Sequence, residues 1–186
     1  MSYEYFASSL PAMRFGEKPP MEPGELLASA CGVLSGEDFA ALSAVFSGAE
    51  SGHPFVAAWR DCETQLRNAV ARRRAARRAS SSPSGAPSDA ASRFERPHGG
   101  WCAAIESGVA AAWQEPDPLA RHRALARLRW DVASELAGPD AFSPSAVLAW
   151  AVKLLVARDL AAVDGEAGLA KLDAAATAAA AGEKRG

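Results

Sequence analysis

Residues 54–79 read PFVAAWRDCETQLRNAVARRRAARRA, and this stretch decides the fold class. Its apolar residues recur at intervals of three and four, which places them on one face of an α-helix. They are Phe55, Trp59, Cys62, Leu66 and the pair Ala69 and Val70. Such a helix would be about 40 Å long, more than a small domain requires. Because its last turns are rich in arginine and carry no apolar stripe, we predict a bundle helix whose C-terminal end projects into solvent.

Helix start and stop signals continue on both sides of this stretch. Ser35 is followed three residues later by Asp38, an aspartate variant of the capping box, and Ser143 precedes a proline at the first helical position. Gly32 and Gly138 follow apolar patterns, at positions where a helix ends. With the apolar spacing, these signals predict helices within residues 21–32, 35–48, 101–113, 115–138 and 142–163, and an alanine-rich helix from about Gly165.

The chain as a whole is predicted to be all-α. No stretch alternates apolar and polar residues as a half-buried strand would, and no hairpin turn joins two such stretches. Residues 80–97 have a Ser- and Pro-rich linker composition that cannot bury enough surface to become ordered. We therefore expect antiparallel helical bundles of six or seven helices, with an N-terminal part in residues 1–79, a flexible loop in 80–97 and a C-terminal bundle in 98–186.

The first residues, MSYEYFASSLPAMRFGEKPPM, show neither helical nor strand periodicity for ten residues. Each residue before a proline is pushed toward extended backbone, as at Leu10 and at Lys18. We expect an extended N-terminal arm that lays its larger apolar side chains across the helices. Those side chains are Tyr3, Tyr5, Phe6, Met13 and Phe15.

Composition limits the class of protein. The 186 residues are 49% hydrophobic, which can furnish a core, and the net charge of -2 argues against a protein devoted to nucleic acid. The three cysteines are far apart, as expected of reduced thiols in a cytoplasm. The most apolar stretch, residues 146–163, carries Lys153, Arg158 and Asp159, so we expect no membrane insertion and a cytoplasmic protein that reaches a membrane only through a partner.

Reactive constellations are sparse in the sequence. His98 and Cys102 stand four apart without a second ligand pair, and Asp131 and Glu135 are expected on a solvated helix face. No phosphate loop, serine elbow or dinucleotide motif occurs. We therefore predict no catalytic residue, metal, cofactor or small-molecule substrate. The tryptophans, at helical spacing from other apolar residues, are expected to lie mostly in the core.

Five arginines crowd the end of the long helix: Arg72, Arg73, Arg74, Arg77 and Arg78. Basic residues are favoured at a helix C-terminus by the macrodipole, so a solvated helix end explains them without a partner. The Arg72–Arg78 cluster could instead grip phosphates, which gives an alternative function as a nucleic-acid-binding helical protein.

Two stretches resemble the signatures of an uncharacterised family of bacterial proteins encoded beside V-type ATPase genes. YEYFASSLPAMRFGEKPP matches a pattern of aromatics, Ser-Leu-Pro, a Phe-Gly pair and two prolines. LRWD, followed by FSPSAVLAWAVKLLVARDLAAVDGEAGLAKL, is similar to the second signature, an Arg-Trp before a helix with an Ala-aromatic-Ala-x-Lys-Leu run and a late glycine. The arginine- and serine-rich middle is not covered. The chain departs at Trp150, where the family usually has tyrosine, and at Arg158 and Asp159, which reverse a Glu-Arg pair.

The family itself resembles the C-type (also called d-type) stalk component of V-type ATPases, an all-helical protein that couples the central stalk to the membrane ring. The resemblance implies a non-enzymatic accessory or central-stalk-type component of a proton- or sodium-transporting ATPase, whose partners are the other V-type ATPase subunits. The residues that would contact a partner lie in the two signatures. They are Tyr3, Tyr5, Leu10, Pro11, Phe15, Arg129, Trp130, Trp150, Lys153 and Leu154.

Overall fold

A computed structural model describes residues 3–81 and 95–163. These residues form helices and no strand, which confirms the all-α class. The helices are α1 (Tyr3–Ser9), α2 (Pro23–Ala30), α3 (Gly36–Ser47), α4 (Pro54–Ser81), α5 (Ala103–Ala112), α6 (Pro118–Ala137) and α7 (Pro144–Ala161). Of the loop predicted in residues 80–97, residues 80 and 81 instead belong to α4, residues 95–97 are not helical, and residues 82–94 lie outside the described residues. The alanine-rich helix predicted from Gly165 also lies outside them.

Helices α3 and α7 begin at the capping residues that were predicted from the sequence. The Ser35 hydroxyl accepts a hydrogen bond from the Asp38 backbone N–H at 3.1 Å, and the Ser143 hydroxyl accepts one from the Ala146 N–H at 3.2 Å. Both bonds satisfy donors that the first helical turn leaves without partners. Gly48, with φ of 72°, ends α3 in the left-handed conformation that favours glycine.

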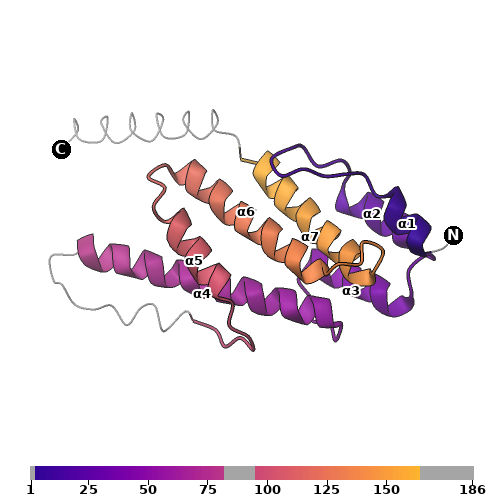
Figure 1. Cartoon of the computed structure of the whole chain (residues 1–186), viewed down its shortest axis with the longest axis horizontal. Helices are drawn as coiled ribbons and strands as arrows, with labels where there is room; N and C mark the ends of the chain where they lie inside the picture. The colour runs from indigo at the N-terminus through magenta and orange to yellow at the C-terminus, as the bar shows by residue number, and fades with distance from the viewer. Residues whose placement is uncertain (1–2, 82–94, 164–186) are drawn as a thin grey trace, which may run out of the picture.

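Helix α7 is the centre of the fold. It runs beside α6 and packs against α2, α3 and α4, while α4 also contacts α6 and α5 packs against both α4 and α6 (Figure 1). Leu148, Ala151 and Leu154 of α7 have no exposed surface. A helix that is apolar on most of its circumference needs neighbours on several sides, which explains its central place.

One core joins the segments on the two sides of the linker. Leu42 and Phe55, from before the linker, lie in the same buried cluster as Leu148 and Leu154, from after it. A second cluster unites α4, α5 and α6 through Leu66, Ile105, Val109 and Val132. Helices from both sides of the linker therefore contribute to the same buried clusters.

The extended N-terminal arm was predicted wrongly for residues 3–9, which form α1. No proline precedes position 11, so the constraint that proline imposes begins only at Leu10. Phe6 is 2% exposed and fixes α1 on the core. Between Leu10 and Glu22 the chain contains turns and no helix. The irregular part of the predicted arm is therefore this segment, which begins after α1.

The tryptophans were expected to lie mostly in the core, and four of the five do pack against it, although only one is fully buried. Trp130 is buried, whereas Trp59, Trp113 and Trp150 are half-buried and Trp101 is 69% exposed. A ring of this size rarely fits wholly inside a small helical protein, and its N–H group needs a polar partner.

Candidate functional site

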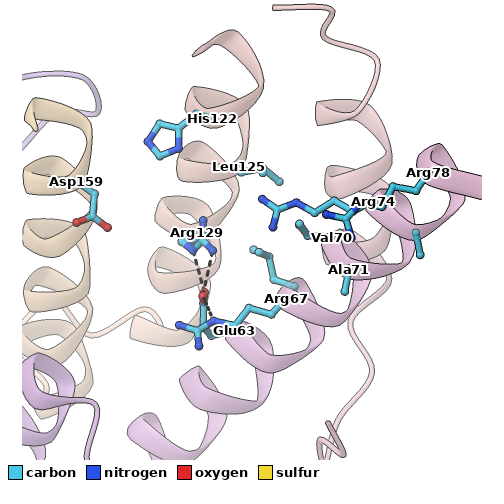
Figure 2. A pocket seen from close by; sticks show the side chains of 12 residues that line it. Glu63, Arg67, Val70, Ala71, Arg74, Arg78, His122, Leu125, Arg129 and Asp159 are labelled. Atoms are coloured by element: carbon cyan, nitrogen blue, oxygen red, sulfur yellow. Dashed lines mark hydrogen bonds and ion pairs between the residues drawn. The ribbon is translucent and has the colours of Figure 1, made fainter. Parts of the chain in front are cut away.

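A groove of about 630 Å³ lies between α4 and α6 and reaches the end of α7 (Figure 2). We call it the α4–α6 groove. Its floor is aliphatic and its rim carries guanidinium groups. It is lined by Glu63, Leu66, Arg67, Val70, Ala71, Arg74, Ala75, Arg78, His122, Leu125, Arg129 and Asp159.

Helical spacing places these side chains on facing surfaces. Leu66, Val70, Arg74 and Arg78 are successive steps of four along α4, so the apolar stripe of the helix turns into an arginine row. From α6, residues 122–129 supply the opposite wall at spacings of three and four. The groove thus continues the helix packing of the second core cluster outward to the surface.

Glu63 links the two walls. Its carboxylate accepts hydrogen bonds from Arg129 Nε at 2.9 Å and Nη2 at 3.0 Å, and from Arg67 Nε at 2.8 Å (Figure 2). The Glu63 side chain is 16% exposed and that of Arg129 is 28% exposed. A fork-shaped, largely desolvated pair of this kind fixes geometry better than an exposed one. Because one carboxylate serves two guanidinium groups, this end of the groove keeps a positive charge.

Arg74 and Arg78 add to that charge. Both are exposed, and their side chains extend from α4 toward the α6 side of the groove (Figure 2). Within residues 3–81 and 95–163 neither makes an ion pair. Asp159, at the end of α7, is the other carboxylate that lines the groove. Four arginines facing two carboxylates leave the α4–α6 groove basic and half apolar.

The predicted arginine cluster is divided around α4. Arg72 turns to α5 and donates to Glu106 at 2.6 Å and to Glu95 at 3.2 Å. Burial lowers the pKa of Arg72, but its hydrogen bonds and attraction to these two carboxylates more than offset this, so the net pKa is raised. Arg72 therefore ties α4 to α5 and to the returning chain, whereas most residues of the last turns after it are exposed, as the sequence predicted.

Arg73 and Arg77 belong to a different surface. They line a second, more open concavity of about 560 Å³ beside the α5–α6 connection. Arg121 lines it too and lies over the Trp113 ring, 5.1 Å from its centroid. The arginines of the cluster thus face three directions, and only Arg74 and Arg78 enter the α4–α6 groove.

Most residues of the two signatures meet at another place, around α6 and α7. The Trp150 indole N–H donates to the Pro11 carbonyl at 3.0 Å, and the Phe15 ring meets the Trp130 ring edge-on at 5.8 Å. Lys153 Nζ lies 5.5 Å from the Trp130 ring centroid. Burial lowers the pKa of Lys153, while Asp131 acts in the opposite direction. We call residues 10–16 with these partners the N-terminal clasp.

The remaining signature residues also serve the fold, with one exception. Leu154 has no exposed surface, and Tyr3 and Leu10 pack on the main core. Burial raises the pKa of the Tyr3 phenol, and the Asp38 charge adds to this. Tyr5 is 59% exposed. Among the predicted contact residues, Arg129 is the one that lines the groove.

Two buried amides were missed by the sequence analysis. Gln65 donates to the Cys102 carbonyl at 2.9 Å and accepts from the Cys102 N–H at 2.8 Å. Asn68 donates to the Arg96 carbonyl at 2.7 Å and accepts from the Arg96 N–H at 3.0 Å. Each amide satisfies both backbone groups of one residue in the returning chain and pins that chain along α4. The sequence does mark both positions, because a polar residue next to the apolar stripe of a predicted helix can be buried only if its side chain finds hydrogen-bond partners.

His98 and Asp131, which the sequence suggested for chemistry, have other partners in the structure. No group of three His, Cys, Asp or Glu side chains within residues 3–81 and 95–163 could hold a metal ion. His98 instead contacts the Gly100 carbonyl, and Asp131 pairs with Arg127 at 3.0 Å on an exposed face. In the described part of the chain no helix is long and apolar enough to cross a membrane. Comparison with family models, curated proteins and solved structures found no match to this chain.

Proposed function

We propose that this chain is a non-enzymatic accessory or central-stalk-type component of a bacterial V-type ATPase, similar to the C-type stalk component, and that it binds its partner through the α4–α6 groove. The observation that carries the binding role is the groove itself, an aliphatic floor flanked by arginines. Apolar surface with arginine at its centre is typical of protein interfaces, where arginine is enriched among the residues that dominate affinity.

The resemblance supplies the ATPase part of the proposal. Its two signatures are more than one hundred residues apart, yet Pro11 and Trp150, and Phe15 and Trp130, are in contact. Because residues of the two signatures contact each other, both signatures have the same structural role, which is to form the N-terminal clasp. The clasp then maintains the fold, and the partner binds at the groove, which the clasp leaves open.

Co-purification tests this proposal. The full chain, affinity-tagged, is expressed together with the V-type ATPase of its source cell and isolated under gentle conditions. We expect ATPase subunits to co-elute with it on size-exclusion chromatography. Elution of the chain alone, with intact ATPase in separate fractions, would contradict the ATPase assignment.

A second function has one observation in its favour. Arg73, Arg74, Arg77 and Arg78 are all exposed on the last turns of α4. If the chain binds nucleic acid there, affinity falls steeply with salt, and neutralising these arginines flattens that dependence. Failure to retard DNA or RNA at low salt removes this alternative.

A further inference from the structure

We infer that the occupant of the α4–α6 groove is an acidic amphipathic helix of a partner protein. This inference rests on the proposed role in protein binding and names the chemistry of the partner. It does not depend on which complex contains that helix.

The shape of the groove indicates a helix. Its two walls are themselves helices, and each presents side chains at intervals of three and four along its axis. Rows with this spacing accept the ridges of a third helix, and helix-in-groove recognition uses the same spacing for its apolar anchors. Val70, Ala75 and Leu125 offer the aliphatic surface on which such anchors can pack.

The charge of the groove indicates that this helix is acidic. Arg74 and Arg78 make no ion pair within the described residues, and the Arg129–Glu63–Arg67 group retains one positive charge. Glutamates on the flanks of an incoming helix would pair with these guanidinium groups while leucines cover the floor. Complementary charge of this kind raises association rates and selects against the wrong partner.

The same features disfavour other occupants. Nucleic acid would leave the aliphatic floor uncovered and would place phosphates near Glu63 and Asp159, which line the groove. Residues 164–186 of this chain carry almost as many basic as acidic side chains, so they offer little charge complementarity. An acidic amphipathic helix would cover the aliphatic floor with its leucines and pair its glutamates with the arginines of the rim.

A peptide probe tests the inference on the full chain. The probe is a capped, fluorescein-labelled peptide of about 18 residues, which gives five helical turns, with leucines on one stripe and glutamates beside it. We expect micromolar binding by fluorescence anisotropy. A peptide with lysines in place of the glutamates should bind at least tenfold more weakly. Equal binding of both peptides, or of neither, would overturn the inference.

Matched variants locate the binding site. Arg74→Glu with Arg78→Glu should weaken binding about tenfold or more, whereas Arg73→Glu with Arg77→Glu, an equal charge change on the same turns of α4, should change it less than about threefold. Ala75→Trp, which fills the floor and keeps every charge, should also weaken binding. Equal losses in the two double variants would show attraction by overall charge and contradict the groove assignment.

Two further measurements exclude other occupants. Displacement of the peptide by single-stranded RNA, with the same sensitivity to Arg74 and Arg78, would assign the groove to nucleic acid. A chain ending at Val163 that binds the peptide about tenfold more tightly would assign it to residues 164–186. Either result overturns the inference. Peptide binding without ATPase co-elution would contradict only the ATPase assignment. ATPase co-elution that is insensitive to the groove variants would contradict the binding role of the groove, and this inference with it, while the ATPase assignment would stand.

Discussion

Glu63 joins the two walls of the α4–α6 groove, because its carboxylate binds Arg129 across the groove and Arg67 on its own helix. Replacement by glutamine would leave a half-buried Arg129 without its anion. Losing one partner of such a pair costs more than losing an exposed pair, since the remaining charge stays desolvated.

We therefore expect Glu63→Gln to lower the free energy of unfolding by about 2 kcal/mol. Urea denaturation measures this, with Asp131→Asn as the control, because Asp131 pairs with Arg127 within one helix and both side chains are at least half exposed. The control should lose less than about 0.5 kcal/mol. Equal losses in both variants would show that Glu63 has no special role.

The cysteines should differ in reactivity. Cys31 is exposed, whereas Cys62 is half-buried and burial raises its pKa, with the nearby Cys102, Asp61 and Glu135 adding to the effect. Because the thiolate is the reactive form, Cys62 should react more slowly than Cys31 with iodoacetamide, and should gain reactivity only at a higher pH. Peptide mass spectrometry over a pH series from about 7 to 10 checks this. Faster labelling of Cys62 than of Cys31 would contradict it.

Individual polar contacts were the hardest features to predict from the sequence. A helix face can be found from spacing, but the partner of each polar side chain depends on which segment returns across it. Nothing in the local pattern of Gln65 or Asn68 shows that Cys102 and Arg96 will lie opposite. The same holds for Arg72, whose neighbours resemble a solvated helix end until Glu95 and Glu106 are placed beside it.

At the scale of elements, the N-terminal clasp links the first segment of the chain to the last described helix. Its Phe-Gly pair has a local cause, because Gly16 has φ of 89° in a turn closed by the Glu17 N–H and the Arg14 carbonyl. A residue with a side chain is strained there. The turn directs Phe15 onto Trp130, with Arg127 5.2 Å from the centroid of the Phe15 ring.

Trp150→Phe should loosen the clasp. Phenylalanine keeps an aromatic ring on α7 but cannot donate to the Pro11 carbonyl, so we expect a loss of about 1 kcal/mol and faster tryptic cleavage after Arg14. The time course of that cleavage is measured by mass spectrometry. Trp101→Phe serves as the control, because Trp101 is 69% exposed. Unchanged cleavage in Trp150→Phe would mean that the clasp does not depend on this hydrogen bond.

Elements were predicted best where a cap and an apolar stripe agreed. Ser35 and Ser143 begin α3 and α7 as expected. Helix α1 was missed because it is short, lacks a recognisable stripe and depends on the burial of Phe6 against helices distant in sequence. Tertiary packing decided this element, and local propensity could not reveal it.

At the scale of the whole molecule, the shared core should make the chain unfold as one unit. Leu42 and Phe55 from before the linker share a cluster with Leu148 and Leu154 from after it. Neither set of helices can therefore bury its apolar face alone. Urea unfolding followed by circular dichroism and by tryptophan fluorescence should give coincident transitions. Two separated transitions would indicate independent N-terminal and C-terminal units.

The groove could not be predicted from the sequence, although three of its arginines were singled out there. Arg74 and Arg78 belong to the predicted arginine cluster, and Arg129 belongs to the second signature. They lie on two helices, α4 and α6, whose relative placement depends on α5 and on the shared core. Only that placement distinguishes a basic groove from a solvated helix end. The division of the arginines among three surfaces follows from the same packing.

The most direct test of the account compares ATPase association among groove variants of the full chain. Wild type, Arg74→Glu with Arg78→Glu, and Arg73→Glu with Arg77→Glu are each co-purified with the V-type ATPase and quantified on size-exclusion chromatography. We predict co-elution of the wild type and of the Arg73 and Arg77 variant, and at least tenfold less of the Arg74 and Arg78 variant. Equal co-elution of all three, or of none, would contradict the claim that the α4–α6 groove binds a component of the ATPase.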